Sequence, residues 1–141
     1  MEKLPTSSIL CQVHAIKNLG ADVYQLKLQL PEQTRLEFYP GQYLMLAAEN
    51  GEFYPFSIAS TPQQLPQIEL HILARNNAAV QLIKEFEQGS PAIIQPPCGD
   101  VRLQDSGKPL LLIAAGTGLA QMHSMLEHCR ITNSNTQIDL Y

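Results

Sequence analysis

The stretch Tyr54-Pro55-Phe56-Ser57-Ile58-Ala59-Ser60-Thr61 decides how the rest of the chain is interpreted. It has the apolar and aromatic residues of a β-strand, but proline cannot donate a backbone hydrogen bond and is confined to sheet edges and bulges. Pro55 therefore predicts a bent or edge strand, where Ser57 and the open backbone beside it can offer hydrogen bonds to a flat ligand. Taken alone, these residues favour a plain strand and turn over a ligand site.

Short alternating segments fill the chain on both sides of this stretch, up to about residue 96. Apolar residues alternate with polar ones at 9–14, 24–30 and 68–72, and mostly apolar strands are expected at 43–48 and 92–95. Turn signals stand between them, namely Pro40-Gly41 and Asn50-Gly51. The pattern predicts a mainly β fold, in which a six-stranded antiparallel sheet closes into a Greek-key barrel.

One helix interrupts the strands. Residues 78–87 repeat their apolar side chains at helical spacing, with Asn77 as the expected N-cap and Gly89-Ser90-Pro91 as the stop.

The pattern changes near Gly107. Residues 110–115 form a continuous apolar run, as expected for a parallel strand covered on both faces. A helix with a stripe of apolar residues follows, and 138–141 begins another strand; the stripe consists of Leu119, Met122, Leu126 and Cys129. We therefore expect two domains, a barrel at 1–105 and the start of an α/β domain at 106–141, which ends after one βαβ unit.

Gly116-Thr117-Gly118 lies between the apolar strand and the helix. Backbone amides at such a helix start can hold a pyrophosphate, although a tight turn that needs small residues explains the three residues equally well.

Composition narrows the classes of function. With 141 residues, 45% of them hydrophobic and 16% charged, the chain is typical of a globular protein, and its net charge of −4 argues against nucleic acid as a partner. No apolar run reaches membrane-spanning length, so no membrane association is expected. Three widely separated cysteines indicate neither a disulfide framework nor a metal site, which favours a cytoplasmic protein.

Four stretches together resemble the ferredoxin reductase superfamily, and especially its NAD(P)H-flavin reductase branch. They occur in the family's order along the chain: Pro40-Gly41-Gln42-Tyr43, Tyr54-Pro55-Phe56-Ser57, Pro97-Cys98-Gly99-Asp100 and residues 111–118. The resemblance implies a flavin-binding barrel followed by the opening of a nicotinamide-dinucleotide domain. It also implies flavin (FAD or FMN, as cofactor or substrate) and NAD(P)H as ligands, with electrons passed on to an acceptor that can be a protein.

The resemblance also implies roles for single residues. Tyr54, Pro55, Phe56 and Ser57 match the family's flavin-contacting motif, in which the Ser57 hydroxyl lies beside the flavin N5 and helps to place the nicotinamide. Tyr54 stands where the motif has an arginine that contacts a flavin phosphate, so tight binding of FAD or FMN is in doubt.

Three further positions complete the expected binding site. Arg75 is a candidate replacement for the missing cation, although an exposed arginine is more often solvated. His71 is a candidate for the flavin face, with a surface position favoured. Gly116, Thr117 and Gly118 are the expected contacts for the nicotinamide dinucleotide.

Two other functions stay open: a non-enzymatic flavin-binding or regulatory barrel, and a subunit of a larger oxidoreductase. Because only the first unit of the second domain is present, we expect the chain alone to oxidise NAD(P)H slowly or not at all, and to self-associate through its C-terminal segment.

Overall fold

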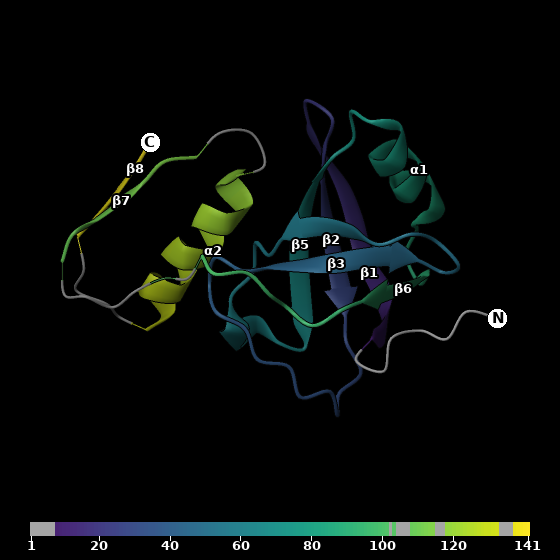
Figure 1. Cartoon of the computed structure of the whole chain (residues 1–141), viewed down its shortest axis with the longest axis horizontal. Helices are drawn as coiled ribbons and strands as arrows, with labels where there is room; N and C mark the ends of the chain where they lie inside the picture. The colour runs from purple at the N-terminus through teal and green to yellow at the C-terminus, as the bar shows by residue number, and fades with distance from the viewer. Residues whose placement is uncertain (1–7, 102, 104–107, 115–117, 133–136) are drawn as a thin grey trace.

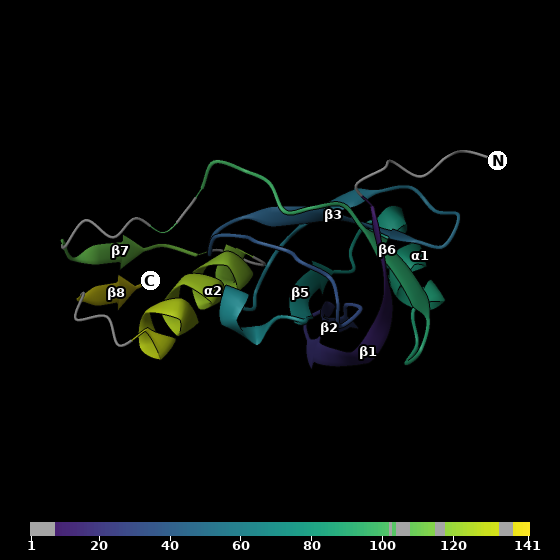
Figure 2. The same ribbon diagram turned by 90° about the horizontal axis from the view of Figure 1, so that it is seen from below.

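The computed structural model describes residues 8–101, 103, 108–114, 118–132 and 137–141. A six-stranded antiparallel sheet curls into a barrel, and a smaller parallel sheet of two strands lies at the C-terminal end of the chain (Figure 1). Helix α2 lies between these two parts in both perpendicular views (Figures 1 and 2).

The barrel has the expected six strands in the order β4-β3-β6-β1-β2-β5. An isolated bridge between Ile58 and Leu70 brings the end of β4 to β5, the strand at the other edge, and so closes the sheet on itself. The strands are β1 (Ile9–Gly20), β2 (Val23–Gln29), β3 (Tyr43–Ala48), β4 (Tyr54–Ser57), β5 (Gln67–Leu73) and β6 (Pro91–Ile94). A short 3-10 helix, η1 (Pro62–Gln64), precedes β5. The prediction of a mainly β, six-stranded barrel is confirmed.

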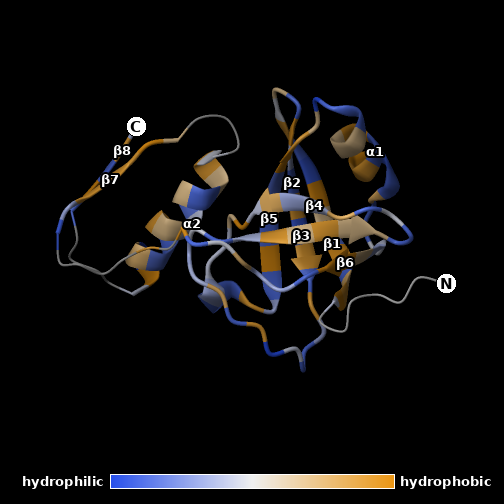
Figure 3. Ribbon diagram, in the orientation of Figure 1, coloured by the Kyte–Doolittle hydropathy of each residue, from blue (hydrophilic) through white to orange (hydrophobic). Residues whose placement is uncertain are grey.

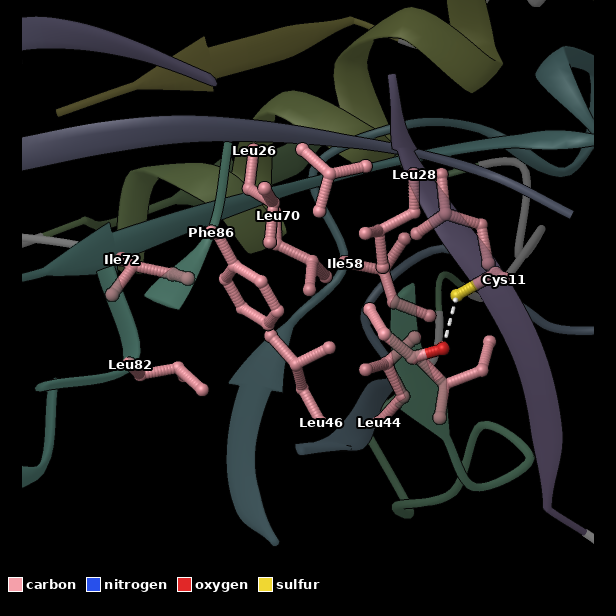
Figure 4. Close-up of a cluster of buried hydrophobic side chains, with 14 of the residues drawn as sticks. Cys11, Leu26, Leu28, Leu44, Leu46, Ile58, Leu70, Ile72, Leu82 and Phe86 are labelled. Carbon is pink, nitrogen blue, oxygen red and sulfur yellow. Dashed lines mark hydrogen bonds between the residues drawn. The ribbon is translucent and has the colours of Figure 1, made fainter. Parts of the chain in front are cut away.

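The core is formed by alternate residues of these strands, because successive side chains of a strand point to opposite faces. Figure 3 shows the resulting alternation of hydrophobic and hydrophilic positions along the barrel strands. Figure 4 shows how side chains from different strands meet inside, among them Leu28, Leu46 and Ile72, each fully buried. Cys11 belongs to the same cluster; its Sγ donates to the carbonyl oxygen of Ala92 at 3.3 Å, and burial raises its pKa to about 12.

Helix α1 (Asn77–Glu85) begins one residue earlier than expected. Asn76, and not Asn77, is the N-cap: its backbone is extended, and its Oδ1 accepts a hydrogen bond from the amide of Ala79 at 2.8 Å. The side chains of Asn76 and Asn77 can both accept a capping hydrogen bond, so the backbone conformation determines which of the two is the N-cap. Leu82 and Phe86 anchor this helix in the barrel core (Figure 4).

Helix α2 (Gly118–Ile131) is followed by β8 (Ile138–Leu140), which pairs in parallel with β7 (Leu110–Leu112). The expected apolar stripe of this helix is wrong at its start, because Leu119 is 48% exposed. The buried face instead carries small and polar residues together with apolar ones: Ala120, Ser124, Met125 and Cys129.

Strand β7 is covered on one face only. Leu112 is buried, whereas Leu111 and Ile113 are 61% and 68% exposed, so a single βαβ unit leaves the other face of this apolar strand uncovered. Among the described residues, no helix combines the length and the apolar character that a membrane crossing requires.

Candidate functional site

The stretch 54–61 begins with an edge strand, as Pro55 predicted. β4 lies at the end of the strand order and takes its ladder from β3, with Ser57 opposite Tyr43 and Pro55 opposite Met45. Since only one side of β4 is fully paired, its other side is available to a ligand.

Three of the four sequence motifs meet around Tyr43. Its amide donates to the carbonyl oxygen of Cys98 at 3.0 Å, and the Cys98 amide donates back at 2.8 Å. The neighbouring side chain of Gln42 donates from Nε2 to the carbonyl oxygen of Gly99 at 3.0 Å, while its backbone oxygen accepts from the amide of Ile58 at 3.1 Å. The motifs around residues 40, 55 and 98 thus form one connected structure.

Helix α2 is fastened to this structure by side chains that donate to backbone oxygens of the barrel. Gln121 Nε2 donates to Gly41 at 2.6 Å, and Ser124 Oγ donates to Ser60 at 2.6 Å. His123 Nδ1 lies 2.8 Å from the carbonyl oxygen of Ala59, which can only accept, so this nitrogen carries the hydrogen. The helix that follows the fourth motif is therefore held against the end of the 54–61 stretch.

A hollow of about 450 Å³ opens where β4, β5 and the start of α1 meet. Tyr54, Pro55 and Phe56 of β4 form one wall, and His71 and Leu73 of β5 form another. Asn76, Ala78 and Ala79 complete the lining. Mostly apolar walls with a few polar groups are typical of sites for small molecules and cofactors, and the volume lies within the usual range. These residues fit a flat heteroaromatic ring such as that of a flavin.

His71 is fixed in the wall of this hollow by a carboxylate. Its Nε2 lies 3.1 Å from Oε2 of Glu69, and Oε1 of Glu69 accepts from Gln25 Nε2 at 2.9 Å. The hydrogen bond from His71 lowers the pKa of Glu69, helped by the charge of the nearby imidazole groups and Lys27. The surface position favoured for His71 is thus wrong, since its side chain is only 14% exposed.

Tyr54 contributes to the hollow but directs its hydroxyl elsewhere. The hydroxyl donates to Oε2 of Glu52 at 3.1 Å, and this bond raises the pKa of Tyr54. The position where the family motif has a cation therefore carries a phenol paired with a carboxylate.

Arg75 lies between β5 and α1, and its side chain is directed to the β1–β2 turn. There Nε is 3.8 Å from Oδ2 of Asp22, and Nη2 donates to the carbonyl oxygen of Ala21 at 3.4 Å. Both charged side chains of this pair are largely exposed, and Arg75 does not line the hollow.

The remaining candidates lie at the end of the hollow or outside the described residues. Ser57 follows Phe56 and is half-buried at the end of β4, but it is not part of the lining. Gly118 is the first residue of α2, as predicted, and Gly116 and Thr117 lie outside the described residues.

Sequence reasoning missed Glu69, Glu52 and the cap residue Asn76. The alternation of β5 held a usable signal for Glu69, because residues two apart on a strand share a face and a carboxylate beside His71 can orient its ring. No local signal identified Glu52, because its role is to accept the hydrogen bond from Tyr54, the residue that stands at the position of the motif's arginine.

Comparisons with known proteins identify the family of this chain. Residues 10–103 match the family model described as an oxidoreductase FAD-binding domain. The NAD(P)H-flavin reductase of Vibrio harveyi is 39% identical over 142 residues, which cover 95% of this chain and 59% of that protein. The NAD(P)H-flavin reductase of Aliivibrio fischeri is 37% identical, over 93% of this chain and 58% of its own length.

The solved structure of phthalate dioxygenase reductase has the same fold. It superimposes with a TM-score of 0.86 at 20% identity and covers 95% of this chain and 43% of that one. This chain thus spans less than two thirds of the length of each of these three proteins. With the barrel, the motif contacts and the matched residues in agreement, the chain belongs to the family of oxidoreductase FAD-binding domains, in the ferredoxin reductase superfamily.

Proposed function

We propose that this chain binds a flavin in the hollow beside β4 and forms the flavin-holding part of an NAD(P)H-dependent flavin reductase. The observation that carries the proposal is the hollow itself, whose walls include Pro55 and Phe56 of the motif together with an oriented His71. The names of the Vibrio and Aliivibrio relatives support the same reaction.

In this reaction the bound flavin would supply the redox chemistry by accepting a hydride from the nicotinamide. The chain would supply orientation and exclusion of water. Phe56 and Leu73 would cover the ring with apolar surface, and Glu69 would hold the imidazole of His71 in one orientation against it. Ser57, at the end of β4, would place the nicotinamide through its hydroxyl.

The nicotinamide side of the site would come from the second domain. We propose a division at residues 1–105 and 106–141, with Gly116, Thr117 and Gly118 as contacts for the dinucleotide. The reduced flavin would then pass its electrons to an acceptor, which can be another protein. We further propose a cytoplasmic setting, because the reducing conditions there suit three cysteines that form no disulfide with one another.

The proposal predicts saturable quenching of riboflavin fluorescence by the 141-residue chain. Ser57→Ala should leave flavin affinity within about twofold of the parent but slow the single-turnover reduction of flavin by NAD(P)H by about tenfold or more, because hydride transfer is sensitive to small misplacement. Ser57→Thr, which keeps the hydroxyl, should recover part of the rate. The absence of saturable quenching would contradict the proposal.

We also propose that the chain self-associates through the exposed face of its small sheet, where a second copy would cover Leu111 and Ile113. Leu111→Asp should then lower the average mass measured by light scattering over a concentration series, because a charge opposes burial of this face. Leu10→Asp is the matched control, since Leu10 on the barrel has the same exposed fraction of 61%. A monomeric parent chain, or equal effects of the two changes, would contradict this proposal.

A further inference from the structure

The side chains of Ser57, Tyr43 and Cys98 form a row across three neighbouring segments of the barrel. Ser57 lies directly opposite Tyr43 in the ladder of β3 and β4, and Cys98 forms an isolated bridge with Tyr43 on its other side. Residues directly opposite each other in antiparallel pairs place their side chains on the same face of the sheet. Leu44, the next residue of β3, is fully buried in the core, so the row lies on the outer face, away from the core.

Tyr43 and Ser57 have the closest spacing that neighbouring strands allow. The amide and the carbonyl oxygen of Tyr43 are both bonded to Cys98, at 3.0 and 2.8 Å, and the amide of Ile58 donates to the carbonyl oxygen of Gln42. This pattern makes Tyr43 and Ser57 a non-hydrogen-bonded pair, in which side chains lie closer together. Their Cβ atoms are then roughly 4.5–5.5 Å apart. A ligand that contacts the Ser57 hydroxyl is therefore within reach of the Tyr43 ring.

The loop after β6 holds the Tyr43 ring in place. Gly99 has a φ of +107°, and a Cβ at this position would lie 3.0 Å from both Cδ1 and Cε1 of Tyr43, so a glycine here lets the ring edge approach the loop. A hydrogen bond with the Cys98 side chain raises the pKa of the Tyr43 phenol, and the charge of Asp100 acts in the same direction. The Tyr43 residue is nevertheless 38% exposed. An aromatic surface that is already fixed loses little conformational entropy when a flat ligand binds to it.

This aromatic surface continues the proposed flavin site. Pro55 lines the hollow beside β4, and Ser57, two residues later, faces the same side of the strand roughly 6.6 Å further along. The three fused rings of a flavin are longer than this step. A flavin that extends along β4 from Pro55 would therefore pass Ser57 and meet Tyr43.

Resting on the proposed function, we propose that Tyr43 is a further binding residue for the flavin, with its phenol ring in contact with the part of the flavin ring that lies beside Ser57. The loop at residues 97–100 then has a defined task, because Cys98 and Gly99 fix the Tyr43 ring in the position that the ligand needs.

The fluorescence of bound riboflavin tests this contact. An excited flavin accepts an electron from a phenol ring that touches it and returns the electron without emitting light, whereas a phenyl ring does not give up an electron in this way. The chain contains no tryptophan, the other side chain that quenches flavins strongly. Tyr54 lines the hollow and would quench as well, so the variants are compared in a Tyr54→Phe background.

In this background, Tyr43→Phe should lengthen the fluorescence lifetime of bound riboflavin several-fold. The affinity, measured by equilibrium dialysis, should stay within about twofold because the aromatic ring is kept. Tyr24→Phe is the matched control: Tyr24 lies opposite the fully buried Ile72, on the inner face of the barrel, so this change should leave the lifetime unaltered. Tyr43→Leu should weaken riboflavin binding about three- to tenfold, because the stacked aromatic surface is lost.

The outcomes separate this proposal from the proposed function. A purely structural role of Tyr43 would not alter the lifetime in the Tyr43→Phe variant. Equal lifetimes in the Tyr43→Phe and Tyr24→Phe variants, or unchanged affinity in Tyr43→Leu, would overturn the contact while leaving flavin binding intact. If dialysis shows no riboflavin bound to the parent chain, the proposed function is wrong, and the contact with it.

Discussion

Gly41→Ala is expected to lower the free energy of unfolding of the chain by roughly 2–5 kcal/mol, which urea denaturation can measure. Gly41 has a φ of +109°, a conformation that side chains with a Cβ rarely adopt. An added Cβ would also lie 2.6 Å from Cε of Met125 in α2 and 2.8 Å from the backbone oxygen of Val101. The methionine end can move, but the backbone oxygen cannot move without shifting the chain.

Gly20→Ala is the matched control for this change. Gly20 has a similar φ of +96°, but nothing lies within 4 Å of the position that a Cβ would take. Gly20→Ala should therefore lower the free energy of unfolding by only about 1–2 kcal/mol, which is the cost of the unfavourable backbone conformation. If both variants lose the same stability, the close approach of α2 and residue 101 to Gly41 is not present in solution.

Ala78→Phe is expected to weaken riboflavin binding by more than about tenfold, because the phenyl ring would occupy space that the ligand needs in the hollow beside β4. Lys84→Phe is the control: it adds the same ring to an exposed position of the same helix that does not line this hollow. Fluorescence titration of both variants, with circular dichroism to verify folding, gives the comparison. A folded Ala78→Phe variant with parent-like affinity would place the flavin elsewhere.

The barrel could be predicted from the sequence because its signals are local. Alternation in β2 and β5 determines which side chains are buried, and Pro55 excludes a central position for β4. The resemblance of the four motifs added the type of ligand. Both the alternation and the motifs belong to short segments, and their interpretation does not require knowledge of the rest of the fold.

The wrong predictions concern residues whose burial depends on the element packed against them. Hydrophobic periodicity placed Leu119 on the buried face of α2, but the surface that this helix meets is polar backbone, so Ser124 is buried there and Leu119 is exposed. The sequence pattern favours a surface position for His71, because its strand neighbours are apolar on the opposite face. The alternation of β5 places Glu69 on the same face as His71, but the hydrogen bond between the two side chains depends on their positions in space.

The way in which α2 is attached has a consequence for recombination between related proteins. Gln121, His123 and Ser124 all donate to main-chain oxygens, at Gly41, Ala59 and Ser60. Every residue has such an oxygen, whatever its side chain. These three hydrogen bonds therefore depend on the path of the barrel backbone and not on the identity of its residues. A barrel taken from a distant relative with the same backbone path would offer the same acceptors. Chimeric chains divided ahead of α2 therefore start with these three contacts in place, without any redesign of the barrel.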